Sequence, residues 1–99
     1  MKRVNNHEVV QLWKEGNPAC NHKRTLYSLD GGLYSYHLKI GYRTDSGTCI
    51  IAEYTAAGEY ASQTTSCHVG IARRYAHLVM HPRVWVTSPL ATPNNNKPF

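Results

Sequence analysis

The sequence predicts an α+β fold: an antiparallel meander of three to four strands packed against two helices, in the order α-β-β-β-α with a possible final strand. Three observations support this. The chain of 99 residues has room for one hydrophobic core. Apolar and polar residues alternate over residues 33–44, and apolar residues recur at helical spacing after residue 66. We assign residues 1–88 to a single domain and residues 89–99, with three prolines, to a flexible C-terminal tail.

The first expected element is a short helix over residues 6–15. Asn5 followed by Glu8 resembles a capping box, and Gly16 with Pro18 supplies the stop signal. The helix is short, so it needs tertiary contacts to be stable. Its apolar face consists of Val9, Val10, Leu12 and Trp13.

Two strands are expected over residues 24–29 and 33–44, joined through Asp30-Gly31-Gly32. A turn at Asp45-Ser46-Gly47 then leads into a third strand over residues 48–55. In the second strand, the face expected toward the helices carries Tyr34, Tyr36, Leu38, Ile40 and Tyr42. The face expected in solvent carries Ser35, His37, Lys39, Gly41 and Arg43.

A second, longer helix is expected to begin near Ser66 and to end near Met80 or His81, because Pro82 disfavours helical geometry in the residue before it. Residues 83–87 alternate and are expected to form a fourth strand or an extended arm. The apolar side of the helix would hold Val69, Ile71, Ala72, Tyr75, Ala76, Leu78 and Val79.

The charge of the chain favours acidic or polyanionic partners. Eleven Lys and Arg against six Asp and Glu leave a formal charge of +5, which suits nucleic acid or an acidic protein surface. Three cysteines without paired spacing indicate a reducing compartment. No apolar run reaches the roughly 20 residues that span a bilayer, and no signal segment is recognisable. We therefore expect a cytoplasmic protein without a membrane partner, and the oligomeric state stays open.

The polar side of the second helix is the best candidate binding site. Its arginines and histidine carry positive charge, and hydroxyl residues near the helix start can cap free N–H groups that also attract anions. Two basic residues on the open strand face would extend this surface if they lay beside the helix. The expected nucleic-acid-binding residues are Thr64, Thr65, Ser66, Arg73, Arg74, His77, Lys39 and Arg43. The alternative is a solvated helix exterior with Ser66 as an ordinary cap.

Other chemistries find less support in the sequence. Cys20, His22, Cys49, Cys67 and His68 offer zinc-type ligands but lack the usual spacers. No signature pairs a cysteine with a histidine for nucleophilic catalysis, and no glycine-rich phosphate loop is present. The tyrosines either stack on a ligand or cover the small core. We therefore predict no enzymatic activity, no metal and no cofactor.

Three segments resemble small single-domain proteins of phages and other mobile elements. They are Leu33-Tyr34-Ser35-Tyr36-x-Leu38-x-Ile40-Gly41, Tyr54-Thr55-Ala56 and Ser62-x-Thr64-Thr65-Ser66-x-His68-Val69-x-x-Ala72-x-Arg74-Tyr75-Ala76. The resemblance covers about residues 26–82 and leaves out the first helix and the tail. It implies a phage-type accessory protein in the host cytoplasm. It supplies no activity and no catalytic residue.

These observations together predict a small, basic, non-catalytic binding protein. It would engage nucleic acid or a nucleic-acid–protein complex through the basic face of the second helix. The alternative is a protein-interaction module that binds or inhibits a host protein by strand pairing or tyrosine contacts.

Overall fold

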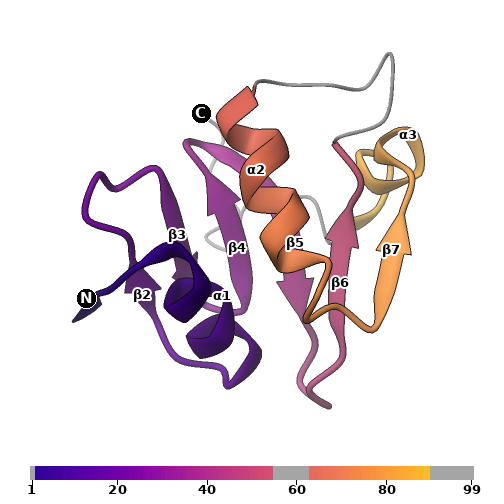
Figure 1. The fold of residues 1–99 in the computed structure, drawn as a ribbon. Helices are drawn as coiled ribbons and strands as arrows, with labels where there is room; N and C mark the ends of the chain where they lie inside the picture. The colour runs from indigo at the N-terminus through magenta and orange to yellow at the C-terminus, as the bar shows by residue number, and fades with distance from the viewer. Residues whose placement is uncertain (1, 55–62, 90–99) are drawn as a thin grey trace.

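One mixed sheet of seven strands, in the spatial order β1 to β7, organises the computed structural model, which describes residues 2–54 and 63–89 (Figure 1). Two main helices, α1 and α2, cover one face of this sheet (Figure 1). The strands are β1 Lys2–Arg3, β2 Ala19–Cys20, β3 Leu26–Leu29, β4 Gly32–Ser35, β5 Leu38–Arg43, β6 Cys49–Ala52 and β7 Leu78–Met80. The helices are α1 Asn6–Lys14, α2 Gln63–Ala72 and α3 Pro82–Trp85. The α+β class is confirmed, and the expected three to four strands are too few.

The sheet has an antiparallel centre and two parallel edges. Strands β2 to β6 pair antiparallel in sequence order. β1 pairs with β2, and β6 with β7, in parallel. A parallel pair needs a crossover connection, and here α1 lies between β1 and β2 in the chain while α2 lies between β6 and β7. The edge strands β1 and β7, one at the end of each crossover, were not predicted, because strands of two or three residues are too short to show a sequence pattern.

The first helix is confirmed with its caps. α1 begins at Asn6, and the Asn5 side chain accepts a hydrogen bond from the Glu8 backbone N–H at 2.9 Å. The Trp13 indole on its buried face donates to the Gly31 carbonyl at 2.8 Å. The hairpin between β3 and β4 is also confirmed, because Asp30 and Gly31 both have positive φ, as a two-residue type I′ turn requires.

The core lies between α1, α2 and the sheet. Trp13 can approach the sheet closely because β5 has a glycine beneath it. A Cβ added at Gly41 would lie 3.1 Å from Trp13 Cζ2 and 2.8 Å from Ile51 Cδ1. The fully buried apolar residues of the two helices and the central strands are Val9, Val10, Trp13, Leu26, Leu33, Ile40, Cys49, Ile51, Ala52, Val69 and Ala72.

The single strand expected over residues 33–44 is wrong. The structure has two strands, β4 and β5, joined by a tight turn at Tyr36 and His37, where Tyr36 has φ +56°. A two-residue turn preserves the alternation of polar and apolar residues, so the sequence pattern runs through it unbroken. The pairing of β4 with β5 is also irregular, because Leu33 pairs with Gly41 while Tyr34 pairs with Lys39, leaving Ile40 as the extra residue.

The expected assignment of the two sheet faces is reversed along β4 and at Gly41 and Tyr42 of β5, whereas Lys39 lies on the face away from the helices, as expected. Ser35 hydrogen-bonds to α2, and Gly41 lies beneath Trp13, so these residues face the helices. Tyr34 and Lys39 lie on the opposite face, where a Cβ added at Gly32 would meet both side chains. Tyr42 lies there too, with the Lys39 ammonium 4.7 Å from its ring centroid. A short strand with apolar residues at both parities does not reveal which face the helices cover.

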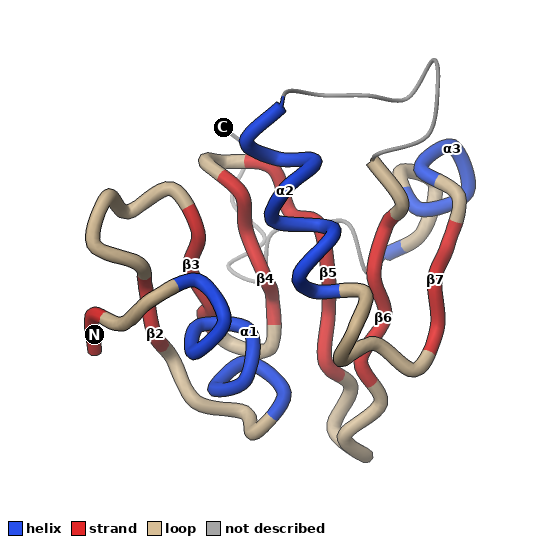
Figure 2. The backbone as a smooth tube through the Cα atoms, in the orientation of Figure 1, coloured by secondary structure: helices blue, strands red, loops and turns tan. Residues whose placement is uncertain are grey.

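The long helix expected from Ser66 to Met80 or His81 is also corrected. α2 begins at Gln63 and ends at Ala72, and Leu78–Met80 forms the edge strand β7 (Figure 2). Residues 64–66 therefore lie within the first turn of α2 instead of preceding it. The His77 N–H donates to the Cys49 carbonyl at 2.8 Å, which starts the pairing beside β6. A short apolar run is compatible with either a helix or a strand, and here pairing with β6 makes residues 78–80 a strand.

The strand or extended arm expected over residues 83–87 is wrong. Pro82 opens the short helix α3, because its fixed φ and missing N–H suit the first helical position. His81 caps this helix by accepting from the Arg83 N–H at 3.1 Å. The buried Trp85 indole donates to the Lys39 carbonyl at 3.0 Å, which ties α3 to β5.

The two remaining strand predictions are confirmed in shortened form, as β3 within residues 24–29 and β6 within residues 48–55. The expected tail lies outside the described residues except for Pro89. No helix among the described residues is long and apolar enough to cross a membrane.

Candidate functional site

The structure does not assemble the expected basic face of the second helix. Arg73 and Arg74 are exposed but follow the last turn of α2. Arg73 Nη1 lies 3.1 Å from Glu53 Oε2, so a carboxylate offsets its charge. His77 Nδ1 accepts a hydrogen bond from the Cys49 N–H at 2.9 Å, which gives this ring a structural task at the start of β7.

The three expected hydroxyl residues lie at the other end of α2. Thr65 is buried, and its Oγ1 is 2.9 Å from Ser35 Oγ. Thr64 is exposed and lines a hollow that faces the start of α1. Thr64 and Arg73 are nine positions apart, which is about 13 Å along a helix axis. Ser66 is not the helix cap, since α2 begins three residues earlier. The hydroxyls and the arginines therefore do not form one anion site.

The two basic residues of β5 do not extend a surface beside α2. Lys39 is 4% exposed, and burial lowers the pKa of its ammonium to about 8. Arg43 is half-buried, and its Nε donates to the carbonyl of Lys14, the last residue of α1, at 2.8 Å. Both were expected in solvent from the alternation of a single long strand, which the structure splits in two.

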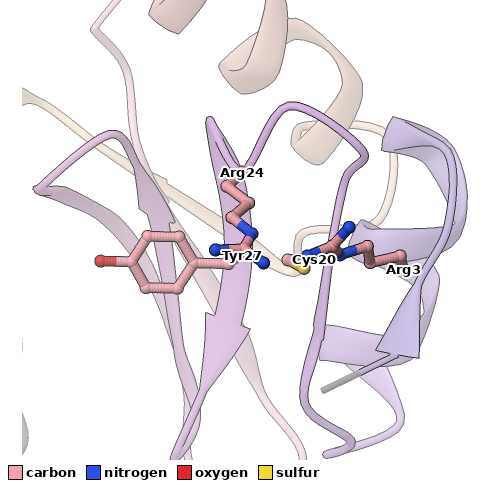
Figure 3. A pocket seen from close by; sticks show the side chains of 4 residues that line it. All are labelled: Arg3, Cys20, Arg24 and Tyr27. Atoms are coloured by element: carbon pink, nitrogen blue, oxygen red, sulfur yellow. The ribbon is translucent and has the colours of Figure 1, made fainter.

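Two other arginines, Arg3 and Arg24, line one hollow near the β1 edge of the sheet, the edge opposite β7. Arg3 of β1 and Arg24 of the β2–β3 loop line an open hollow of about 490 Å³ together with Cys20 and Tyr27 (Figure 3). Figure 3 shows the two arginine side chains approaching Cys20 from opposite sides. None of these four residues is acidic, and both arginines are exposed. The hollow therefore presents two guanidinium groups to solvent.

The strand register creates this arrangement. Arg3 pairs with Cys20, Cys20 pairs with Tyr27, and Tyr27 pairs with Tyr34. These four paired residues, one from each strand, form a row across β1 to β4. Paired residues point to the same side of a sheet, and Tyr34 lies on the face opposite α1 and α2. The Tyr27 and Tyr34 rings stack with centroids 4.9 Å apart and planes 9° apart. Burial raises the pKa of Tyr27, so its phenol is neutral at physiological pH.

The loop that carries Arg24 is held by the buried amide of Asn21. Asn21 Oδ1 accepts from the Thr25 N–H at 2.8 Å and the Leu26 N–H at 3.3 Å, and its Nδ2 donates to Asn6 Oδ1 at 2.9 Å. Arg24 has φ +60°, a conformation that costs a non-glycine residue about 1–2 kcal/mol. The Asn21 network fastens this strained loop to the start of α1 and thereby fixes where Arg24 projects.

Sequence reasoning did not single out Arg3 and Arg24. The adjacent pairs Lys2-Arg3 and Lys23-Arg24 are the only local signal. The two pairs are about twenty positions apart, and only the parallel pairing of β1 with β2 brings them to one edge. That pairing involves two residues in each strand, so the sequence pattern could not indicate it.

The described residues contain no group of three or more histidine, cysteine or acidic side chains that could hold a metal ion. The zinc-type ligands named from the sequence are thus not brought together. Cys49 is buried, and burial raises the pKa of its thiol, which keeps the sulfur protonated and weakly nucleophilic.

No protein-family model, no curated protein and no solved structure matches the chain. The resemblance to small phage proteins therefore stays a prediction. What the protein binds has to be inferred from the surfaces described above.

Proposed function

We propose that the protein is a non-catalytic nucleic-acid-binding protein, and that the hollow lined by Arg3 and Arg24 binds the phosphate backbone of the nucleic acid. One observation carries the proposal: two arginines about twenty positions apart in the chain meet in a hollow whose four described lining residues include no acid. Guanidinium groups match phosphate oxygens with paired, charge-assisted hydrogen bonds. The formal charge of +5 adds a favourable long-range field for a polyanion.

The neighbouring tyrosine fits a nucleic acid better than a free phosphate ion. Tyr27 is half-buried, lines the same hollow and is held flat against Tyr34. A ring fixed in this way can contact a base or sugar without losing side-chain entropy on binding. Asn21 holds the loop in the conformation that sets the direction of the Arg24 side chain, so less freedom is lost at this residue on binding.

The salt dependence of affinity tests the proposal. We expect the wild-type protein to bind mixed-sequence single-stranded DNA or RNA, with log Kd rising linearly with log salt concentration. The double variant Arg3→Gln/Arg24→Gln removes two phosphate contacts, so the slope should fall by about 1.4 for a single strand. The matched control is Arg73→Gln/Arg74→Gln, which removes the same charge from the end of α2 and should lower the slope far less.

Two results would contradict the proposal. One is the absence of binding to any single-stranded or double-stranded pool at low salt. The other is the reverse ranking of the two double variants, which would place the interface on α2 as the sequence alone predicts. Thermal unfolding of each variant checks that the fold is retained.

A second candidate function, protein binding by strand addition, is favoured by the β7 edge. Leu78 is 55% and Val79 51% exposed, and Val84 and Val86 of the adjoining α3 region are exposed as well. β7 is the last strand of the sheet, so its outer side faces no further described strand. An open apolar edge can accept an extended segment of another protein. Such binding would persist at high salt, and Val79→Pro would abolish it while Arg3→Gln/Arg24→Gln would not.

A further inference from the structure

A second hollow lies on the helix-bearing side of the sheet. Its volume is about 580 Å³, and it is formed where the start of α1, the β2–β3 loop and α2 meet. Its lining includes Asn6 and His7 from α1, Lys23 from the loop, and Thr64 and His68 from α2. Neither the proposed nucleic-acid contact nor the β7 edge uses these residues.

His68 is the most buried of the residues that line this hollow. Its side chain is fully packed, with the residue 2% exposed, and its Nδ1 lies 2.7 Å from Ser35 Oγ. Ser35 Oγ in turn lies 2.9 Å from Thr65 Oγ1, so two buried hydroxyls orient the imidazole. Burial lowers the pKa of His68, which makes the neutral ring the dominant form at pH 7.

The other ring nitrogen, Nε2, has no hydrogen-bond partner among the described residues. Every fully buried side-chain nitrogen and oxygen of the described residues has a hydrogen-bond partner. Within the described chain, Nδ1 holds the ring's hydrogen bond and Nε2 has none, so Nε2 is not fully buried. His68 lines the hollow, and Nε2 therefore opens into it. An accessible ring nitrogen can hydrogen-bond to water in the free protein and to a ligand group that replaces this water.

The lining of the hollow offers hydrogen-bond donors and one lysine. Asn5 caps Glu8 and leaves the first N–H groups of the nine-residue α1, those of Asn6 and His7, outside the helical hydrogen-bond ladder. These groups carry the positive end of the helix dipole. Lys23 of the β2–β3 loop and Thr64 of α2 also line the hollow, and no described lining residue is acidic.

We propose that this hollow binds a small phosphate monoester of about the size of a mononucleotide. The phosphate would lie against the first turn of α1 and Lys23, and a polar group of the organic part would pair with His68 Nε2. Ile71 supplies one apolar wall for the organic part. The volume falls in the range of pockets that enclose small organic ligands and exceeds what a bare phosphate would fill. This inference does not depend on the nucleic-acid proposal, because the hollow lies on the other face of the sheet.

Nuclear magnetic resonance titration of the whole chain tests it. The probes are inorganic phosphate and the 5′-monophosphates of adenosine, guanosine, cytidine and uridine. We expect at least one mononucleotide to shift the Asn6 and His7 amide signals and the His68 Nε2 signal together, with saturation. Inorganic phosphate should move the two amides and leave His68 Nε2 in place.

Variants make the test specific. Lys23→Gln removes a charge-assisted contact and should weaken mononucleotide binding about tenfold or more. Lys14→Gln, an exposed lysine at the opposite end of α1, is the matched control and should bind as the wild type does. His68→Gln should weaken mononucleotides and leave inorganic phosphate unaffected.

Three outcomes would overturn the inference: no saturable shift of His68 with any of the four mononucleotides, equal affinities of Lys23→Gln and Lys14→Gln, or shifts confined to Arg3 and Arg24. The last result would assign phosphate binding to the other hollow alone.

Discussion

Lys39 shows how much a single residue depends on the strand it belongs to. Alternation along residues 33–44 predicts it in solvent on the face away from the helices. It does lie on that face, paired with Tyr34, but it is buried there. Its ammonium lies over the Tyr42 ring, an attraction that only partly offsets the loss of water. Burial is the reason its pKa falls to about 8 from the ordinary 10.5.

Lys39 predicts a pH dependence of stability with a definite sign. Between pH 8 and 10.5 the unfolded chain binds the Lys39 proton more tightly than the folded chain, so the free energy of unfolding rises with pH. The shift corresponds to about 3 kcal/mol at the end of that window. Chemical denaturation of wild type and Lys39→Met at several pH values measures it.

The difference between the two proteins isolates Lys39. Cys49 and Tyr27 have raised pKa values and destabilise both proteins alike as they ionise at high pH. We expect the wild-type minus variant free energy to climb from pH 8 to 10.5. A flat difference would show that Lys39 titrates as an exposed lysine.

Ser35 offers a second test at the residue scale. Its buried hydroxyl is shared by His68 Nδ1 and Thr65 Oγ1, so Ser35→Ala removes a partner from both at once. We expect a loss of about 1–3 kcal/mol in the free energy of unfolding. Ser46→Ala, in an exposed turn, is the control and should change it by less than about 0.5 kcal/mol. Equal effects of the two substitutions would refute the buried network.

At the level of elements, the sequence predicts those features that depend only on contacts between residues close together in the chain. The capping residues of α1 and the Asp30-Gly31 turn need only neighbours in the chain, and both are confirmed. The end of α2 and the identity of β7 depend on β6, which lies more than twenty residues earlier, so the periodicity after residue 66 was misleading. Whether Pro82 ends or begins a helix is likewise decided by the site that Trp85 fills.

Two glycines in different elements should respond oppositely to the same change. Gly70 lies inside α2 with nothing within 4 Å of an added Cβ, so Gly70→Ala should raise the free energy of unfolding by about 0.5–1 kcal/mol. Gly41→Ala places a Cβ 3.0 Å from the Ile50 carbonyl and against Trp13, so it should lower stability by about 1–3 kcal/mol. Thermal and urea unfolding of the pair test this, and a destabilised Gly70→Ala would contradict the helix boundaries given for α2.

At the scale of the whole molecule, the two parallel edges define what the surface can do. The crossover through α1 brings β1 against β2 and thereby places Arg3 near Arg24 (Figure 1). The crossover through α2 brings β7 to the far edge, where its apolar residues are exposed. The net charge was readable from the sequence, but its location was not, because it follows from pairings between residues far apart in the chain. None of the eight residues expected in the interface lines the hollow of Arg3 and Arg24.

The most direct test of the Arg3–Arg24 interface is a map of nucleic-acid contacts by nuclear magnetic resonance, using a short mixed-sequence single strand at low salt. We expect the guanidinium signals of Arg3 and Arg24 and the ring signals of Tyr27 to shift together on titration, while those of Arg73 and Arg74 stay near their free positions. Shifts concentrated on Arg73 and Arg74, or no shifts at all, would contradict it.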